Sequence, residues 1–262
     1  MVLERLISMR MALRQPMWML VTGALVSAIC MAISVFIFQT SVGMFTTLLI
    51  TIAMTPFMVN LVRYEEDREE QSQDIEKMNF LQRHRDILKV YSAFFVGITL
   101  TMVAAYLILP QTLVESIFHD QTTEISAIRG NVAFVDTFQK ILLNNFGVLF
   151  LAFLLSFLFG AGAVFILVWN ASVLATAIGI AAKEIGGVGG LPLAIFVFFP
   201  HGSLEILAYF IAGIAGGIIS TVILRRRSKK FWFVIEDSFQ LMAIAGVLLV
   251  VAAVVESFSI TF

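Results

Sequence analysis

Runs of about 20 apolar residues recur along this chain and constrain its fold more than any other feature. A helix of about 20 residues crosses the ~30 Å hydrocarbon core of a bilayer. Inside that core the backbone must bond to itself, so each run predicts a transmembrane helix. The clear runs are residues 17–38, 42–62, 91–109, 146–168, 204–224 and about 239–255. The sequence therefore predicts an all-α, polytopic transmembrane helix bundle of six or seven spans.

Composition and charge agree with a membrane protein and exclude a nucleic-acid-binding one. Of the 262 residues, 60% are hydrophobic and 13% charged, whereas soluble domains carry about 25% charged residues. The net charge is −1, and the basic residues form short clusters instead of covering one face. We therefore predict a single transmembrane domain over residues 1–262, with the lipid bilayer as its main partner.

The number of spans depends on the stretch between residues 168 and 204. Residues 171–182 are apolar, but a helix from Asn170 to Glu184 reaches only about 22 Å. The glycine-rich turn 186–190 follows, and then a second short apolar piece, 191–199. Either 171–182 crosses the bilayer as a thin helix, or 191–199 enters partway and turns at Pro200.

Basic clusters predict the orientation in the cell membrane. Placing three of them on one side puts 14 of the 17 Lys and Arg residues in the cytoplasm, as the positive-inside rule requires. The clusters lie within residues 5–14, 63–89 and 225–230. We expect a multi-pass protein with a cytoplasmic N-terminus and a C-terminus outside.

Two segments between spans are expected to be helical as well. Residues 63–90 are charged and lack Gly and Pro, which predicts a cytoplasmic helical hairpin extension. This hairpin is either solvated or a docking face for a cytoplasmic partner. Residues 111–144 repeat apolar side chains at helical spacing, which predicts helices at the outer interface.

The segment 200–205, Pro-His-Gly-Ser-Leu-Glu, is the most informative local motif. Pro200 removes a backbone N–H, so we expect one helix to end before it and another to begin after it, as a broken or re-entrant helix at Pro200-His201-Gly202. A carboxylate near the bilayer centre costs about 2.5–3.5 kcal/mol, which makes such residues functional candidates. His201 and Glu205 are four residues apart and share a helix face, which makes them the candidate functional pair.

This pair has three interpretations. Glu205 can cap a helix that begins at Gly202, with His201 bonding to it or to a free carbonyl. The pair can instead bind a proton or small solute in a cavity. As a third reading, His201 and Glu205 are ligands of zinc or another divalent metal, although catalytic zinc usually takes three protein ligands.

Other polar residues are candidates to support the pair. Asparagines bracket the span 146–168 and either cap helices or line the same cavity. Glu184, at the end of the short apolar piece, is a further candidate. The supporting residues are Asn144, Asn145, Asn170, Pro200, Gly202 and Glu184.

Small residues in two spans predict close helix–helix packing. Gly213 and Gly217 form a GxxxG pair, and small residues also gather in the run 146–168. They serve packing within one chain, a homodimer contact, or both. The packing residues are Ser156, Gly160, Ala212, Gly213, Gly216 and Gly217.

These motifs, in this order, resemble the stage II sporulation protein M family. The resemblance covers about residues 141–224 and rests on the paired asparagines, the glycine-rich span and the Pro-His-Gly…Glu signature. It implies a polytopic cell-membrane protein of a family whose members in spore-forming bacteria recruit cell-wall hydrolases during engulfment. It also implies that Asn145, Asn170, His201 and Glu205 form the family constellation. Residues 80–95, around His84, resemble the archaeal branch, so engulfment itself is not expected to transfer.

Three functions follow as hypotheses. The first is a scaffold that recruits an envelope or cytoplasmic partner in envelope or membrane remodelling, with no catalytic residue and no cofactor. The second is a transporter or channel in which His201 and Glu205 line a wet cavity. The third is an intramembrane metalloenzyme that uses the same pair.

Overall fold

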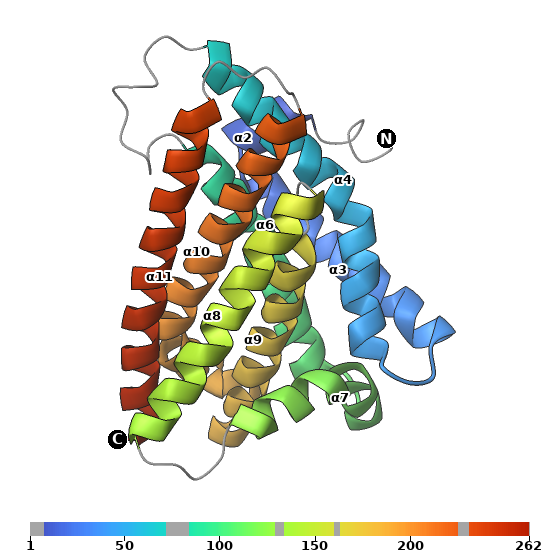
Figure 1. The fold of residues 1–262 in the computed structure, drawn as a ribbon. Coiled ribbons are helices and arrows are strands. Elements are labelled where there is room, and N and C mark those ends of the chain that lie inside the picture. Colours follow the sequence, from blue (N-terminus) through green and yellow to red (C-terminus); the bar gives the residue numbers. More distant parts are fainter. Residues whose placement is uncertain (1–7, 72–83, 129–133, 160–162, 225–230, 262) are drawn as a thin grey trace.

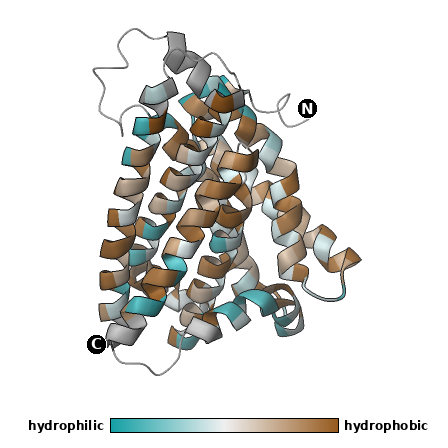
Figure 2. Cartoon of the chain, viewed as in Figure 1, coloured by the Kyte–Doolittle hydropathy of each residue, from teal (hydrophilic) through white to brown (hydrophobic). Residues whose placement is uncertain are grey.

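The computed structural model is a bundle of helices, and it describes residues 8–71, 84–128, 134–159, 163–224 and 231–261. Within these ranges there is no strand, and seven helices are long and apolar enough to cross a membrane. Figure 2, coloured by residue hydropathy, shows that these helices consist mostly of hydrophobic residues. The all-α polytopic bundle is therefore confirmed. Its elements are α2 (Met9–Arg14), α3 (Met17–Ile37), α4 (Val42–Gln71), α6 (Arg85–Ile108), α7 (Gln111–Ile128), α8 (Phe134–Phe159), α9 (Ala163–Ile185), the 3₁₀ helix η2 (Gly187–Gly190), α10 (Leu191–Leu224) and α11 (Phe231–Thr261).

The helices pack in two groups that share α9. In the C-terminal group α10 contacts α8, α9 and α11, and in the N-terminal group α3 contacts α4 and α6. Helix α9 contacts α4 and α6 as well as α10, so it joins the two groups. Figure 1 shows α2 at one end of the bundle, and α7 with the C-terminus at the other. We call the second of these the α7 end.

The boundary between the fourth and fifth spans differs from the prediction. The expected span 146–168 is divided, because α8 ends at Phe159 and α9 begins at Ala163. Helix α9 then has 23 residues, about 34 Å, which is enough to cross the bilayer. The apolar signal continues through residues 160–162, which lie outside the described ranges, so hydropathy alone did not separate the two helices. The prediction that 171–182 is a short piece was wrong.

The predicted helix break at Pro200 is also wrong, because α10 is one helix of 34 residues with Pro200 inside it. Proline removes one backbone bond, but in a membrane the neighbouring helices and nearby hydroxyl groups can compensate for it. The backbone acceptor that Pro200 leaves without its helical donor is the carbonyl of Phe196, four residues earlier. No water competes for the remaining backbone groups at this depth, which favours continuation of the helix.

The glycine-rich turn between α9 and α10 has a clear conformational reason. Gly186 has φ of 149° and Gly187 has φ of 69°, a region that side chains other than glycine rarely adopt. These two residues reverse the chain at the α7 end, and η2 leads directly into α10.

The two segments between spans are helical in their described parts. Helix α4 continues to Gln71 and α6 begins at Arg85, while residues 72–83 of the expected hairpin lie outside the described ranges. At the other end α7 covers Gln111–Ile128. Helix α8 begins at Phe134, so residues 134–144 are continuous with a spanning helix.

Candidate functional site

Glu205 lies where three spanning helices meet. The Asn145 Nδ2 amide of α8 donates a hydrogen bond of 2.7 Å to Glu205 Oε1 on α10. The carboxyl group of Glu205 also lies within hydrogen-bonding reach of that of Glu256 on α11. Asn144 donates to Asn145 Oδ1 at 3.3 Å. We call Asn144, Asn145, Glu205 and Glu256 the carboxyl cluster.

The carboxyl cluster lies in the part of the bundle nearer the α7 end. Asn145 is seven residues from the start of the span Phe138–Phe159, and Glu256 is two residues from the end of Ile235–Phe258. Asn145 is only 5% exposed, and both glutamates are half-buried. Tyr209, one turn beyond Glu205 on α10, is fully buried. The cluster therefore lies between helices, with Asn145 buried and Asn144 exposed.

The contact between the two glutamates has a chemical requirement. An ionised carboxylate has only acceptor atoms, so two carboxyl groups share a hydrogen bond only if one of them holds a proton. Two like charges at this distance repel each other strongly in a medium of low dielectric constant. The cluster can therefore hold one proton and one negative charge.

His201 does not join these contacts. It lies one turn before Glu205 on α10 and is 7% exposed. Its ring centroid is 5.8 Å from that of Phe198, and its buried Nδ1 atom has no hydrogen-bond partner. Among the described contacts, none joins His201 to Glu205. The structure thus places the two predicted partners on one helix but links Glu205 to α8 and α11.

The remaining predicted supporting residues lie apart from the cluster. Asn170 is inside α9, where its amide donates to the Ile166 carbonyl at 2.8 Å, within its own helix. Glu184 is exposed near the end of α9. Gly202 faces Leu174 of α9 instead of α8 or α11. Asn144 and Asn145 are the predicted supporting residues that the structure brings to Glu205.

Sequence reasoning missed Glu256. This residue directly follows the last apolar run, 239–255, where an acidic residue is ordinarily read as the polar end of a span. The available signal was that three further apolar residues, Phe258, Ile260 and Phe262, follow Glu256 in the sequence. Only the packing of α11 against α10 shows that this carboxyl group points inward.

The metal hypothesis has few candidate ligands in the described structure. Among the residues described, there is no group of three or more His, Cys, Asp and Glu side chains that could hold a metal ion. Metal binding at His201 and Glu205 remains a prediction from the sequence.

Small residues bring α8, α9 and α10 into close contact within the chain. A Cβ atom at Gly216 would meet the Phe153 carbonyl oxygen and lie 2.9 Å from the Phe157 nitrogen. One at Gly213 would lie 2.7 Å from the Ala163 Cβ. The Ser156 hydroxyl accepts a hydrogen bond from the Ala163 N–H at 3.0 Å. Ala212 and Gly217 are buried on α10, and Gly160 lies outside the described residues.

A second polar contact joins α6 and α11 near the opposite end of the bundle. His84, just before α6, lies with its Nε2 atom 3.5 Å from Asp237 Oδ2 on α11. Both side chains are buried. The contact connects the two helix groups on the side of the bundle that the basic residues predict to be cytoplasmic.

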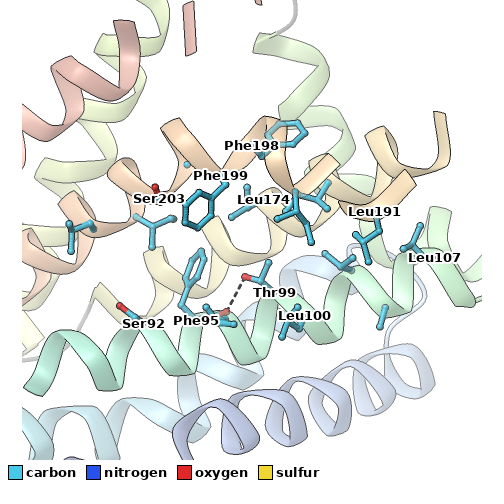
Figure 3. A pocket seen from close by; sticks show the side chains of 18 of the residues that line it. Ser92, Phe95, Thr99, Leu100, Leu107, Leu174, Leu191, Phe198, Phe199 and Ser203 are labelled. Carbon is cyan, nitrogen blue, oxygen red and sulfur yellow. Dashed lines mark hydrogen bonds between the residues drawn. The ribbon is translucent and has the colours of Figure 1, made fainter. Parts of the chain in front are cut away.

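A cavity in this structure is separate from the carboxyl cluster. It has a volume of about 780 Å³ and lies between α6 and α10, with α9 at its base (Figure 3). Neither His201 nor Glu205 lines it. The predicted wet cavity at that pair is therefore not the cavity found here.

One of three comparisons with known proteins found a match. The family model described as Stage II sporulation protein M matches residues 32–259, which include all seven spanning helices at least in part. No curated protein and no solved structure matches the chain. Because the family model covers far more than half of the chain, this integral membrane protein belongs to the stage II sporulation protein M family.

Proposed function

We propose that this chain is a non-catalytic membrane scaffold that recruits a protein partner through the cytoplasmic end of α4. The observation that carries the proposal is the length of α4. Its apolar span ends at Glu65, but the helix continues to Gln71, about 9 Å further. The added residues are Glu66, Asp67, Arg68, Glu69, Glu70 and Gln71. Because these charged residues directly follow the apolar span, we place this end of α4 outside the hydrocarbon core, on the cytoplasmic side.

The carboxyl cluster supports the same function. Its hydrogen bonds connect α8, α10 and α11 to each other and do not face the cavity. Polar contacts between membrane helices hold a bundle together, and the Gly216 contact adds close packing. A rigid bundle that holds an extended α4 is what a scaffold requires. Recruitment is also what the family resemblance implies, without the engulfment process.

A photo-crosslinking experiment in native membranes tests the scaffold. A photoreactive amino acid at position 63, where Arg63 is exposed, is expected to crosslink to a different protein. Reversing the acidic run (Glu66, Asp67, Glu69 and Glu70 to Lys) should remove that product. The matched control, Glu115→Lys with Glu124→Lys on α7, should keep it. A product that survives reversal of the acidic run contradicts the proposal, and a product of two copies of this chain would instead indicate a homodimer.

A second candidate function is transport of a proton or small solute. It is favoured by the proximity of the Glu205 and Glu256 carboxyl groups, because carboxyl groups within membrane spans often mark proton pathways. Proteoliposomes with a pH-sensitive dye inside distinguish the two functions. Transport predicts protein-dependent proton flux that Glu205→Gln abolishes, whereas the scaffold predicts the same flux for the wild type and the variant.

The proposed orientation places α2 in the cytoplasm and α7 outside. Helix α2, the end of α4 and the start of α6 lie at one end of the bundle and carry Arg10, Arg14, Arg63, Arg85 and Lys89. In a Cys30→Ala background, Ser126→Cys on α7 should react with an impermeant maleimide applied to intact cells. Gln15→Cys should react only after the membrane is opened. Labelling in the reverse order would place the N-terminus outside.

A further inference from the structure

The cavity of about 780 Å³ between α6 and α10 forms a groove that is separate from the carboxyl cluster. We call it the groove. It runs along both helices, as Figure 3 shows with Ser92 near one end and Leu107 and Leu191 near the other. All of its α6 and α10 lining residues belong to the spans Arg85–Ile108 and Gly187–Thr221. The groove is therefore surrounded by the hydrocarbon core rather than by water.

Its lining is complementary to an uncharged hydrocarbon. None of the residues that line it is charged, and only Ser92, Thr99 and Ser203 carry hydroxyl groups. Thr99 donates to the Phe95 carbonyl at 2.9 Å, and Ser203 to the Pro200 carbonyl at 3.4 Å. Two of the three hydroxyl groups are thus already used inside their own helices, and a polar ligand would lose its hydrogen bonds on entry.

The groove is open to the side, toward lipid. Leu100 on α6 is 50% exposed and Phe199 on α10 is 68% exposed. Gly202 lies between them on the α10 side and keeps the groove wide, since a Cβ there would meet only Leu174 Cδ1 at 3.6 Å. A larger residue at position 202 would project into the free space.

The dimensions of the groove distinguish a hydrocarbon chain from a helix. From Ser92 to Ile108 the groove extends about 24 Å along α6, so a volume of about 780 Å³ gives a mean cross-section of about 33 Å². A transmembrane helix with side chains is about 10–12 Å wide, a cross-section of roughly 80–110 Å². An extended hydrocarbon chain fits within this groove, whereas a helix of a partner or of a second copy is wider and can only lie across its open side.

We propose that this groove holds the hydrocarbon chain of a membrane lipid as a bound ligand, distinct from the lipids around the bundle. Its length of about 24 Å exceeds one leaflet of the ~30 Å core, so the bound chain reaches past the bilayer midplane. The site is independent of the proposed scaffold function, because it uses neither the α4 extension nor the carboxyl cluster.

Photolabelling with a lipid tests this site. The protein is placed in nanodiscs that contain phosphatidylcholine with a diazirine on its acyl chain, and labelled peptides are mapped by mass spectrometry. We expect labelling of residues 92–108 and 191–210 in excess of α3, whose exposed residues Ile29 and Ile33 report contact with ordinary lipid. Gly202→Phe should remove this excess. The matched control Gly147→Phe should keep it, since Gly147 on α8 is exposed and has no atoms near its Cβ position.

A second variant distinguishes a filled groove from a misfolded protein. Leu100→Trp fills the groove from α6, at a position that already faces lipid, and should remove the excess labelling at an unchanged melting temperature. Equal labelling of the groove and of α3 would overturn the proposal. Excess labelling that survives both filling variants, or crosslinks from the groove to another protein chain in place of lipid, would overturn it as well.

Discussion

A leucine in place of Gly216 is expected to prevent native packing of the bundle, and an alanine is expected to weaken it markedly. The added Cβ meets the Phe153 carbonyl and lies 3.0 Å from the Ser156 Cβ, so α8 and α10 must move apart. Backbone atoms cannot rotate away as a flexible side chain can. We expect the alanine variant to lose about 3 kcal/mol, the upper end of the usual cost of overpacking. Its Tm in detergent should fall by roughly 6–12 °C.

The matched control for this prediction is Gly147→Ala on α8. Nothing lies within 4 Å of a Cβ at that position, and alanine favours a helix over glycine by about 0.5–1 kcal/mol. Its Tm should be equal to that of the wild type or slightly higher. If the Tm of Gly216→Ala equals that of Gly147→Ala, the close contact between α8 and α10 does not contribute to stability.

Removing the polar group of Glu205 is expected to have the second largest effect. In Glu205→Leu, the Asn145 amide that donates at 2.7 Å and the Glu256 carboxyl group both lose a partner between helices. Leaving buried polar groups unpaired costs about 2–4 kcal/mol here. We therefore expect a clearly lower Tm, measured in detergent by thermal unfolding, and earlier exposure of α11 to protease.

The conservative variant Glu205→Gln separates hydrogen bonding from charge. Its carbonyl oxygen can accept from Asn145, and its amide can donate to Glu256, as a protonated carboxyl group does. Its free energy of unfolding should stay within about 1 kcal/mol of that of the wild type, so its Tm should change little. Glu115→Leu, at an exposed position on α7, should leave the Tm unchanged. A Glu205→Leu variant as stable as Glu205→Gln would show that these hydrogen bonds do not hold the three helices together.

Much of the candidate site could be predicted from local sequence. Glu205 and the paired asparagines were identified because ionisable and amide groups are costly in hydrocarbon and must therefore be paired. Their pairing partner could not be predicted in the same way. His201 shares a helix face with Glu205, but the face alone does not say which neighbouring helix lies against it. Glu256 comes from a helix that starts 26 residues after Glu205, and only packing brings it there.

The helical, membrane-spanning nature of the chain followed from sequence alone, because hydrocarbon offers the backbone no other hydrogen-bond partners. That argument depends only on the composition and length of each apolar run, which can be read from the sequence without knowing how the helices pack. The division of α8 from α9 and the passage of α10 through Pro200 were decided by tertiary structure. Hydropathy does not change across residues 160–162, and proline interrupts a helix only where nothing else compensates for the lost bond. The neighbours of α10 are α8, α9 and α11, and they are known only once the helices are packed.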